Sequence, residues 1–243
     1  MESSQMKALE QNRDNYEMLY GKDEAFLRHP ADWVIRFHNI FLKHNIRKDA
    51  LLLDYGCGAG NNSIFFLQKG YSVYGVDVAH AFKRLLAKNF ELHNIDNSLL
   101  TNFSVINPDS TVLDFADGTF DFVLSNQVLY YLPSEDHIKK VCYDIKRILR
   151  PNGFVFFTMI GLRNYYISHY LKQVHSSQIY EIEINDAKHR LNGIHEFLLP
   201  IRDEEHLCSM FDMFEPVTTG YFDQKLFDVH SNFHYIFVGK NSK

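Results

Sequence analysis

The chain has 243 residues, 46% of them hydrophobic and 15% aromatic, which is enough apolar material for the core of one large domain. Its formal net charge of −5 excludes a global positive field of the kind that gathers phosphate backbones, so a nucleic-acid partner is not expected. The longest apolar stretch, around residues 154–162, is too short to span a membrane, and the first twenty residues lack the apolar block of a secretory signal. We therefore expect a soluble, cytoplasmic protein without membrane contact.

The first forty-eight residues predict two helices, with Pro30 near the start of the second. Short apolar runs then alternate with stretches of helical spacing, a pattern typical of a parallel sheet covered on both faces. The predicted strands lie at residues 51–55, 71–77, 120–125 and 153–160, the last being the fifth in order. The predicted helices lie at residues 62–69, 80–93 and 134–149, with Ser134 as the N-cap of the third.

After the fifth strand we expect an irregular, aromatic-rich segment at residues 161–200 and a helix at 203–211. Two final strands, at 215–222 and 233–239, are joined too closely for a helical crossover, so they should pair antiparallel. No repeat or Pro/Gly/Ser linker divides the chain, which predicts a single domain. Its expected parts are an N-terminal helical cap (1–48), a core (49–160), a cap insertion (161–200) and a C-terminal helix with the strand pair (201–243).

The cysteines and histidines give no metal or disulfide pattern. Cys57, Cys142 and Cys208 are far apart without a CxxC pair, so we expect them to be reduced and mostly buried. His230 and His234 are four residues apart and form a candidate metal pair, but their segment runs into a predicted strand and no third ligand is near. The favoured interpretation is two polar histidines at a strand, and no metal is predicted.

A glycine-rich turn follows the first strand. Gly56, Gly58 and Gly60 alternate after Asp54, just before a helix begins, so a ligand could lie against bare backbone near a helix N-terminus. The spacing differs from the G-x-G-x-x-G of nicotinamide dinucleotide sites, which counts against a dehydrogenase. Asp77 ends the second strand, where a carboxylate can accept hydrogen bonds from both hydroxyls of a ribose lying over the turn.

Four segments in this order resemble the motifs of class I S-adenosylmethionine-dependent methyltransferases. They are DYGCGAG, GVD, DSTVLDFADGTFDFVLSNQVLYYL and IKRILRPNGFVFF, and together they cover residues 51–158. The resemblance implies a Rossmann-like, doubly wound α/β fold with a seven-stranded sheet, mostly parallel with an antiparallel C-terminal pair. It also implies methyltransferase activity with S-adenosylmethionine as the cofactor.

Carried over residue by residue, the resemblance assigns a contact to each part of the cofactor. The turn from Asp54 to Gly60 would hold the methionine moiety, Asp77 the ribose, and Asn126 would lie beside the sulfonium. Asp109 would accept from the adenine amino group while the Ser110 N–H donates to the ring. The full set of predicted cofactor residues is Asp54, Gly56, Cys57, Gly58, Gly60, Asp77, Val78, Asp109, Ser110 and Asn126.

The sequence departs from the family pattern at two positions, Asn61 in place of a basic residue and Asp114 in place of a proline. The fourth strand ends in SNQV and lacks the N/D-P-P-Y/F segment of methyltransferases that act on adenine or glutamine nitrogens. The LYYL that follows resembles the small-molecule branch instead. We therefore expect a small polar acceptor, such as a sugar or a natural-product intermediate.

In this family the acceptor is covered by the N-terminal helices and by insertions after the fifth strand, here residues 15–41 and 161–200. Both combine aromatic and hydrogen-bonding side chains, among them Tyr16, Tyr20, Phe26, Arg28, His29, Trp33, Arg163 and Arg190. Tyr165 with His169, and Tyr166 with Tyr170, are spaced to form two ring stripes on one helix. A hydroxyl acceptor would need a general base, for which His169, His195 and Tyr131 are the candidates.

Two other functions stay open at this point. A binding module would keep the cofactor contacts and transfer nothing, whereas an RNA methyltransferase would show salt-dependent retention on polynucleotide. The sequence identifies neither the acceptor atom nor the oligomeric state.

Overall fold

The computed structural model describes residues 3–21, 29–176, 178–189, 191–225 and 231–242. Its helical elements, in chain order, are α1 (Ser3–Tyr20), α2 (Asp32–Phe37), the π-helical turn η1 (His38–Leu42), α3 (Lys43–Asn45), α4 (Asn61–Gln68), α5 (Phe82–Leu92), the 3-10 turns η2 (Asn97–Asn102) and η3 (Leu129–Tyr131), α6 (Glu135–Ile148), α7 (Tyr165–Tyr170) and α8 (Glu204–Met210). Its strands are β1 (Leu51–Tyr55), β2 (Ser72–Asp77), β3 (Phe103–Val105), β4 (Phe120–Ser125), β5 (Leu149–Ile160), β6 (Leu171–Val174), β7 (Tyr180–Glu183), β8 (His195–Leu198), β9 (Glu215–Phe222) and β10 (His234–Lys240). None of these helices is both long and apolar enough to cross a membrane.

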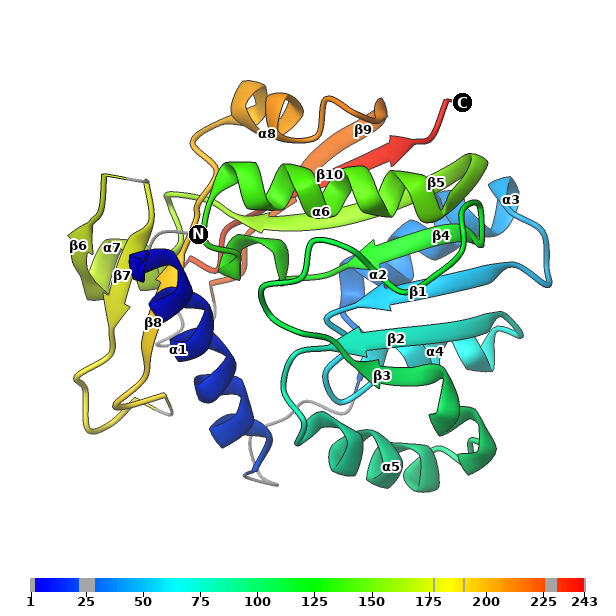
Figure 1. Ribbon diagram of the computed structural model, residues 1–243, viewed down its shortest axis with the longest axis horizontal. Coiled ribbons are helices and arrows are strands. Elements are labelled where there is room, and N and C mark those ends of the chain that lie inside the picture. The colour runs from blue at the N-terminus through cyan, green and yellow to red at the C-terminus, as the bar shows by residue number, and fades with distance from the viewer. Residues whose placement is uncertain (1–2, 22–28, 177, 190, 226–230, 243) are drawn as a thin grey trace.

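The main sheet has seven strands in the order β3-β2-β1-β4-β5-β10-β9. The pairs from β3 to β5 are parallel, whereas β10 is antiparallel to both β5 and β9. The predicted mostly parallel sheet with an antiparallel C-terminal pair is confirmed (Figure 1). Strand order reverses between β1 and β4, and in such sheets ligands bind outside the carboxyl ends of the strands at that point.

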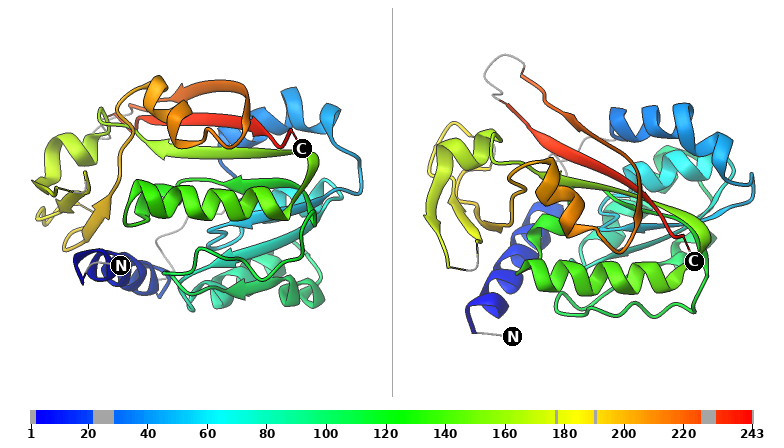
Figure 2. Two further views of the ribbon diagram at one scale, coloured as in Figure 1. Left: turned by 45° about the horizontal axis from the view of Figure 1, so that its top comes forward. Right: turned by 90° about the horizontal axis from the view of Figure 1, so that it is seen from above.

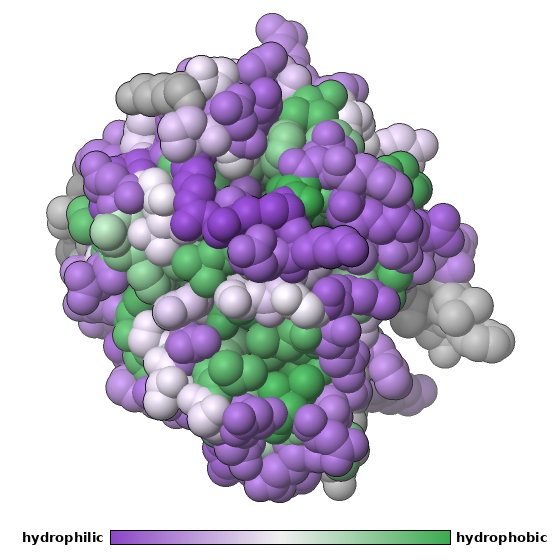
Figure 3. Space-filling model, turned by 90° about the vertical axis from the view of Figure 1, so that its right-hand side faces the viewer, coloured by the Kyte–Doolittle hydropathy of each residue, from purple (hydrophilic) through white to green (hydrophobic). Residues whose placement is uncertain are grey.

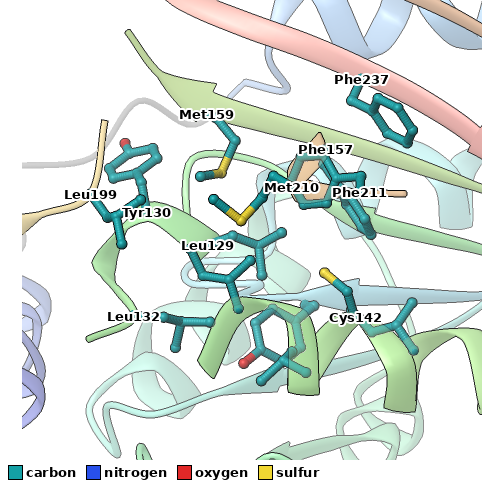
Figure 4. Close-up of a cluster of buried hydrophobic side chains, with 14 of the residues drawn as sticks. Leu129, Tyr130, Leu132, Cys142, Phe157, Met159, Leu199, Met210, Phe211 and Phe237 are labelled. Atoms are coloured by element: carbon teal, nitrogen blue, oxygen red, sulfur yellow. The ribbon is translucent and has the colours of Figure 1, made fainter. Parts of the chain in front are cut away.

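Helices cover both faces of the sheet, so its central strands are apolar on both sides. Leu52 of β1 packs in one core cluster with α2, α4 and α5, while the next residue, Leu53, packs in the other with α6 and α8. Figure 2 shows α6 and α8 on one side of the sheet and α2 and α4 on the other. Figure 4 shows how aromatic and sulfur-containing side chains, such as Phe157 and Met210, fill the space under α6 and α8.

Capping residues fix where the helices begin. The hydroxyl of Ser134 accepts from the His137 N–H at 3.1 Å, which confirms Ser134 as the N-cap of α6. Asp203 caps α8 in the same way, accepting from the His206 N–H at 2.8 Å. The predicted helices at 62–69, 80–93, 134–149 and 203–211 are confirmed to within two residues at each end.

The segment at residues 161–200 is not irregular as expected. It contains α7 and a second sheet, β6-β7-β8, in which both strand pairs are antiparallel. These strands are only four residues long and carry charged side chains among apolar ones, so they lack the apolar runs by which the main strands were found. Figure 1 shows this sheet beside the carboxyl ends of the main strands, with α1 alongside β8.

The fifth strand begins at Leu149 rather than at residue 153, so Pro151 lies inside it. Asn152 there has a φ of +65°, and the pairing with β4 shifts register between Phe120 and Phe122. This irregularity lets a residue without an N–H stand in the strand. The third strand, which the sequence pattern did not locate, is the short β3.

Ion pairs connect the amino ends of the central strands. This is the edge of the sheet opposite the carboxyl ends, where ligands bind in such folds. Asp121 of β4 accepts from the Leu51 N–H at 2.8 Å and forms ion pairs with Arg47 and Arg150. Burial alone would raise the pKa of Asp121, but these donors hold it below its ordinary value. Figure 3 looks onto this end of the molecule, where a polar band runs between two apolar patches.

Candidate active site

A cavity of about 530 Å³ opens at the carboxyl ends of β1, β2 and β4. One end is lined by residues at or just after the ends of these strands: Gly56, Cys57, Gly58, Asp77, Val78 and Asn126. The other end is lined by side chains from α1, η3, α7 and β8, including Tyr16, Tyr130, Tyr131, Tyr166, Glu196 and Leu198. The volume is in the usual range for small-molecule sites, and polar groups stand at both ends.

The glycine turn is shaped by hydrogen bonds to β2. The N–H groups of Gly56 and Cys57 both donate to the Val76 carbonyl, at 2.8 and 3.0 Å. Gly58 has a φ of +49°, and a Cβ placed there would lie 2.8 Å from the Tyr20 hydroxyl oxygen. The turn therefore needs glycine both for its backbone conformation and for the close approach of α1.

Asp77 and the turn are directly bonded. Its Oδ2 accepts from the Gly58 N–H at 2.9 Å and its Oδ1 from the Ala79 N–H at 3.0 Å. Burial raises the pKa of Asp77 to about 6, although these backbone donors favour the ionised form. The carboxylate is thus fixed at the edge of the cavity, with lone pairs left for further donors.

Asp54 and Gly60 lie behind the turn and not on the cavity lining. Asp54 accepts from the Ser63 hydroxyl at 2.6 Å, which joins β1 to α4, and burial raises its pKa to about 7. Gly60 is the N-cap of α4 with a φ of +79°, and a Cβ there would lie 2.2 Å from Leu86 of α5. In the structure both residues hold the helices against the strands.

The loop after β3 reaches the cavity through other residues than those predicted. Ile106 and Pro108 line it, whereas Asp109 and Ser110 are half-buried beside it and do not. The Ser110 N–H donates to the Asn107 carbonyl at 3.0 Å within a turn. The two predicted adenine contacts are therefore next to the cavity wall rather than in it.

Asn126 is held by residues from two elements. Its Oδ1 accepts from Trp33 Nε1 of α2 at 2.7 Å and from the Thr158 hydroxyl of β5 at 3.2 Å. Trp33 in turn stacks on Phe222, with ring centroids 3.6 Å apart and planes 8° apart. The amide group of Asn126 is thereby oriented at the tip of β4.

Of the three candidate bases, the structure brings only Tyr131 to the cavity. Its ring meets that of Tyr16 edge-on at 5.3 Å, and burial raises the pKa of both phenols well above the ordinary value. His195 points to the other face of its strand, where its Nε2 is 2.8 Å from the Glu181 carboxylate. His169 is exposed on α7, with its ring centroid 4.2 Å from that of Tyr165. Of the four residues predicted to form ring stripes on this helix, Tyr166 lines the cavity.

Helix α1 is fastened over the cavity by two asparagines. The Asn12 side chain makes two hydrogen bonds to the backbone of Phe197. It donates to the Phe197 carbonyl at 2.8 Å and accepts from the Phe197 N–H at 2.9 Å. Asn12 also donates to the Tyr131 carbonyl at 3.1 Å, and Asn15 donates to the His195 carbonyl. These bonds satisfy the free edge of β8 and join α1, η3 and β8 into one wall.

Glu196 faces the cavity from β8 and is only 8% exposed. None of the described side chains or N–H groups donates a hydrogen bond to its carboxylate. Because burial removes water without supplying a partner, its pKa is raised to about 7. A buried carboxyl of this kind is a candidate for binding a cation or accepting a proton.

The cysteines and His234 form no metal site with the other residues that the structure describes, although Cys57 and His234 line the cavity. Cys57 and Cys142 are buried and Cys208 is half-buried, and all three are free thiols. His234 is stacked on Phe222 at 4.9 Å, and burial lowers its pKa to about 4. Among the described residues no group of three or more His, Cys, Asp or Glu side chains could hold a metal. Phe26, Arg28, Arg190 and His230 lie outside the described residues.

Residues 53–157 match the family model described as a methyltransferase domain. This segment therefore carries a methyltransferase domain, and solved structures that share the fold of the chain include S-adenosylmethionine-dependent methyltransferases. The matched residues run from β1 through most of β5, so the domain includes the glycine turn, Asp77 and Asn126.

Individual proteins similar to the chain share this domain. The Ubiquinone biosynthesis O-methyltransferase of Pseudomonas entomophila is 28% identical over 110 residues, which are 45% of this chain and 44% of that protein. The human Thiol S-methyltransferase TMT1B is 32% identical over 106 residues, 44% of this chain and 41% of that protein. The match thus spans less than half the length of either relative.

A solved structure matches the fold over nearly the whole chain. The 1,6-didemethyltoxoflavin-N1-methyltransferase of Burkholderia thailandensis, solved with 1,6-didemethyltoxoflavin and S-adenosylhomocysteine, has a TM-score of 0.61 at 18% identity. It covers 98% of this chain and 91% of its own. The likeness in fold therefore continues beyond the methyltransferase domain model at both ends.

The sequence pattern did not indicate two residues of the cavity wall, Asn12 and Glu196. Asn12 stands in a polar helix and gives no local signal, because its partners are more than a hundred residues away. Glu196 gives a weak local signal. In the short strand β8 its side chain points to the same face as that of Leu198, and those of His195 and Phe197 point to the other face. Had this strand been recognised, a charged residue at an inward position would have been noticed.

The raised pKa of Glu196 predicts a pH-dependent stability difference between the wild type and Glu196→Gln. Below about pH 4 the carboxyl is protonated in the folded and the unfolded chain, so it adds no pH dependence. Between the ordinary pKa of a glutamate and the folded pKa of about 7, only the unfolded chain ionises, so the wild type loses about 3 kcal/mol of stability relative to the variant as the pH rises to about 7. Tyr16, Tyr130 and Tyr131, which face Glu196, stay neutral over this range because burial raises their pKa values.

Urea unfolding of the ligand-free proteins at a series of pH values measures this difference. Glu183→Gln is the control: hydrogen bonds from Lys172 lower the pKa of Glu183, so the wild type should gain relative to that variant as the pH rises. Parallel pH profiles for the wild type and Glu196→Gln would mean that Glu196 is not a buried, unpartnered acid.

Proposed function

We propose that the protein transfers a methyl group from S-adenosylmethionine to a small polar molecule. The observation that carries this proposal is a single cavity with two kinds of wall. One end is the glycine turn with Asp77, and the other is a group of tyrosines with Glu196. A cofactor bound at the first end would have its reactive group directed along the cavity toward an acceptor at the second.

At the first end we assign each residue the part of the cofactor that its chemistry suits. Asp77 accepts from the ribose hydroxyls, and the bare backbone from Gly56 to Gly58 holds the methionine moiety. Asn126 lies beside the sulfonium, and Ile106 and Pro108 give the adenine an apolar contact next to Asp109. When bound, the cofactor supplies a methyl group on positively charged sulfur, ready for in-line displacement.

The protein's own residues then align the acceptor and exclude water. α1 closes the cavity through the bonds of Asn12 to β8 and η3, and the tyrosine rings provide apolar contact with polar tips. Alignment in a dry site contributes most of the rate enhancement for a displacement of this kind. A sugar or a natural-product intermediate has the size and polarity for such a cavity.

The names of similar proteins leave the acceptor atom open. They include an O-methyltransferase of ubiquinone biosynthesis, a thiol S-methyltransferase and a methyltransferase of a toxoflavin N1 position. All three names refer to small molecules, which supports a small acceptor here. The acceptor atom has to be argued from this chain's own residues.

The test is turnover. The purified protein should bind S-adenosylhomocysteine by calorimetry and form it from S-adenosylmethionine in the presence of a small-molecule acceptor. Binding without turnover on any acceptor would favour a binding module instead. Activity confined to RNA, with salt-dependent retention on polynucleotide, would favour the nucleic-acid alternative.

Asp77→Ala is expected to weaken binding of S-adenosylhomocysteine by about 1.5–3 kcal/mol, the usual contribution of hydrogen bonds to a charged group. The variant loses the carboxylate that faces the cavity from the tip of β2. Isothermal calorimetry measures the change, and thermal unfolding checks that the variant folds. Asp114→Ala, which removes an exposed carboxylate outside the cavity lining, should bind as the wild type does. Equal affinities of the wild type and a folded Asp77→Ala would refute the ribose role.

A further inference from the structure

We propose that Glu196 binds the acceptor as a cation and takes its proton, so that the acceptor is a primary or secondary amine. This inference rests on the proposed function and names its substrate class. It is carried by a carboxylate buried in the cavity wall without a partner from the protein.

The pairing register of the small sheet explains why Glu196 has no partner. Glu196 is opposite Ile182 of β7, and both point to the apolar side of the sheet with Leu198. The charged residues of β6 and β7 are on the other face, where Lys172 reaches both Glu181 and Glu183. The sheet thus pairs its other acids with bases and leaves one carboxylate facing the cavity.

The groups around Glu196 are rings and hydroxyls. Tyr16 comes from α1 and Tyr130 and Tyr131 from η3. Burial raises the pKa of all three, and the nearby charge of Glu196 raises it further. No described Lys, Arg or His lies within ion-pair distance of Glu196. Arg13 also lines the cavity but is 2.7 Å from the Asp14 carboxylate. The acceptor end therefore offers one negative charge among aromatic rings.

This surrounding suits an ammonium group. Aromatic faces attract a cation, and a buried carboxylate that has no protein partner is compensated by the opposite charge of the ligand. A neutral hydroxyl could donate a hydrogen bond to Glu196 but would not compensate its negative charge. An alcohol is also a much weaker acid than an ammonium, whose ordinary pKa is about 10, so a carboxylate near neutrality can deprotonate only the latter at a useful rate.

The proton and electron pairs can be followed through the step. The acceptor ammonium gives one proton to the Glu196 carboxylate, and the nitrogen lone pair that this frees attacks the methyl carbon. The new N–C bond forms as the C–S bond breaks, and its electron pair stays on sulfur to give neutral S-adenosylhomocysteine. The product leaves as the methylated ammonium, and Glu196 returns its proton to solvent when the cavity opens.

The experiment uses matched amines and alcohols as probes, each pair with the same carbon skeleton: benzylamine with benzyl alcohol, phenethylamine with 2-phenylethanol, and tyramine with tyrosol. Formation of S-adenosylhomocysteine is measured at saturating S-adenosylmethionine for the wild type, Glu196→Gln and the control Glu183→Gln. Glu183 is on the same small sheet but pairs with Lys172 on the opposite face. Calorimetry with S-adenosylmethionine and S-adenosylhomocysteine is run on all three proteins.

We expect turnover of amines and not of their alcohols, unchanged in Glu183→Gln and reduced about a hundredfold or more in Glu196→Gln. Both cofactor forms should bind all three proteins equally. Turnover of alcohols as fast as amines, retained amine turnover in Glu196→Gln, or no turnover of any amine would overturn the proposal. Weaker binding of S-adenosylmethionine alone in Glu196→Gln would make Glu196 the sulfonium's counter-ion, which also overturns it. If the wild type binds neither cofactor form, the proposed function itself fails.

Discussion

Replacing Gly58 with valine is expected to weaken binding of S-adenosylhomocysteine by about a hundredfold or more while most of the fold is kept. Gly58 has a φ of +49°, a region that a β-branched residue avoids, and the Tyr20 hydroxyl lies 2.8 Å from the position of the first side-chain carbon. The strained valine would also displace the backbone N–H of residue 58, which donates a hydrogen bond to the Asp77 carboxylate. Isothermal calorimetry gives the affinity, and circular dichroism gives the fold.

Cys57→Ala is the matched control for this variant, since Cys57 is the adjacent residue in the same turn and also lines the cavity. Alanine there removes a thiol and adds no bulk, so the affinity should change little. If Gly58→Val bound S-adenosylhomocysteine as tightly as the wild type, the turn would be structural and the ligand would bind elsewhere.

Asn12→Ala is expected to lower the free energy of unfolding by about 2–4 kcal/mol and to reduce methyl transfer more than cofactor binding. The Asn12 side chain makes three hydrogen bonds to backbone atoms of Phe197 and Tyr131, and alanine would leave those peptide groups without partners. Tyr131 lines the cavity, and Phe197 lies between Glu196 and Leu198, which also line it. Loosening these two residues should therefore disturb the proposed acceptor end first.

Urea unfolding and S-adenosylhomocysteine formation measure the two effects of Asn12→Ala. Glu10→Ala is the control on the same helix, because the Glu10 side chain is exposed. If the two variants were equally stable and equally active, the link between α1 and β8 would not hold the wall together.

The main sheet and the contact between the glycine turn and Asp77 could be predicted from the sequence because their information is local. Each central strand is a continuous apolar run, and the topology of a parallel sheet then brings Gly58 and Asp77 to the same edge. Likewise, Ser134 follows Pro133 and precedes two acids, which is enough to locate the start of α6.

The acceptor end could not be predicted in this way because it depends on pairing between distant short segments. Glu196 faces the cavity only because β8 pairs with β7 in one register, and a shift by one residue would bring His195 there instead. Asn12 is important only because α1 lies along the edge of β8, 185 residues further along the chain. Neither arrangement is visible in composition or periodicity.

The bond from Trp33 to Asn126 has a practical consequence for following ligand binding. Trp33 is the only tryptophan in the sequence, and its indole N–H is 2.7 Å from an oxygen at the cofactor end of the cavity. Its ring is also stacked on that of Phe222 in the C-terminal strand pair. The emission of this one indole therefore provides an unlabelled optical signal from the place where α2, β4 and β9 meet, and the occupancy of the site can be titrated with the natural protein.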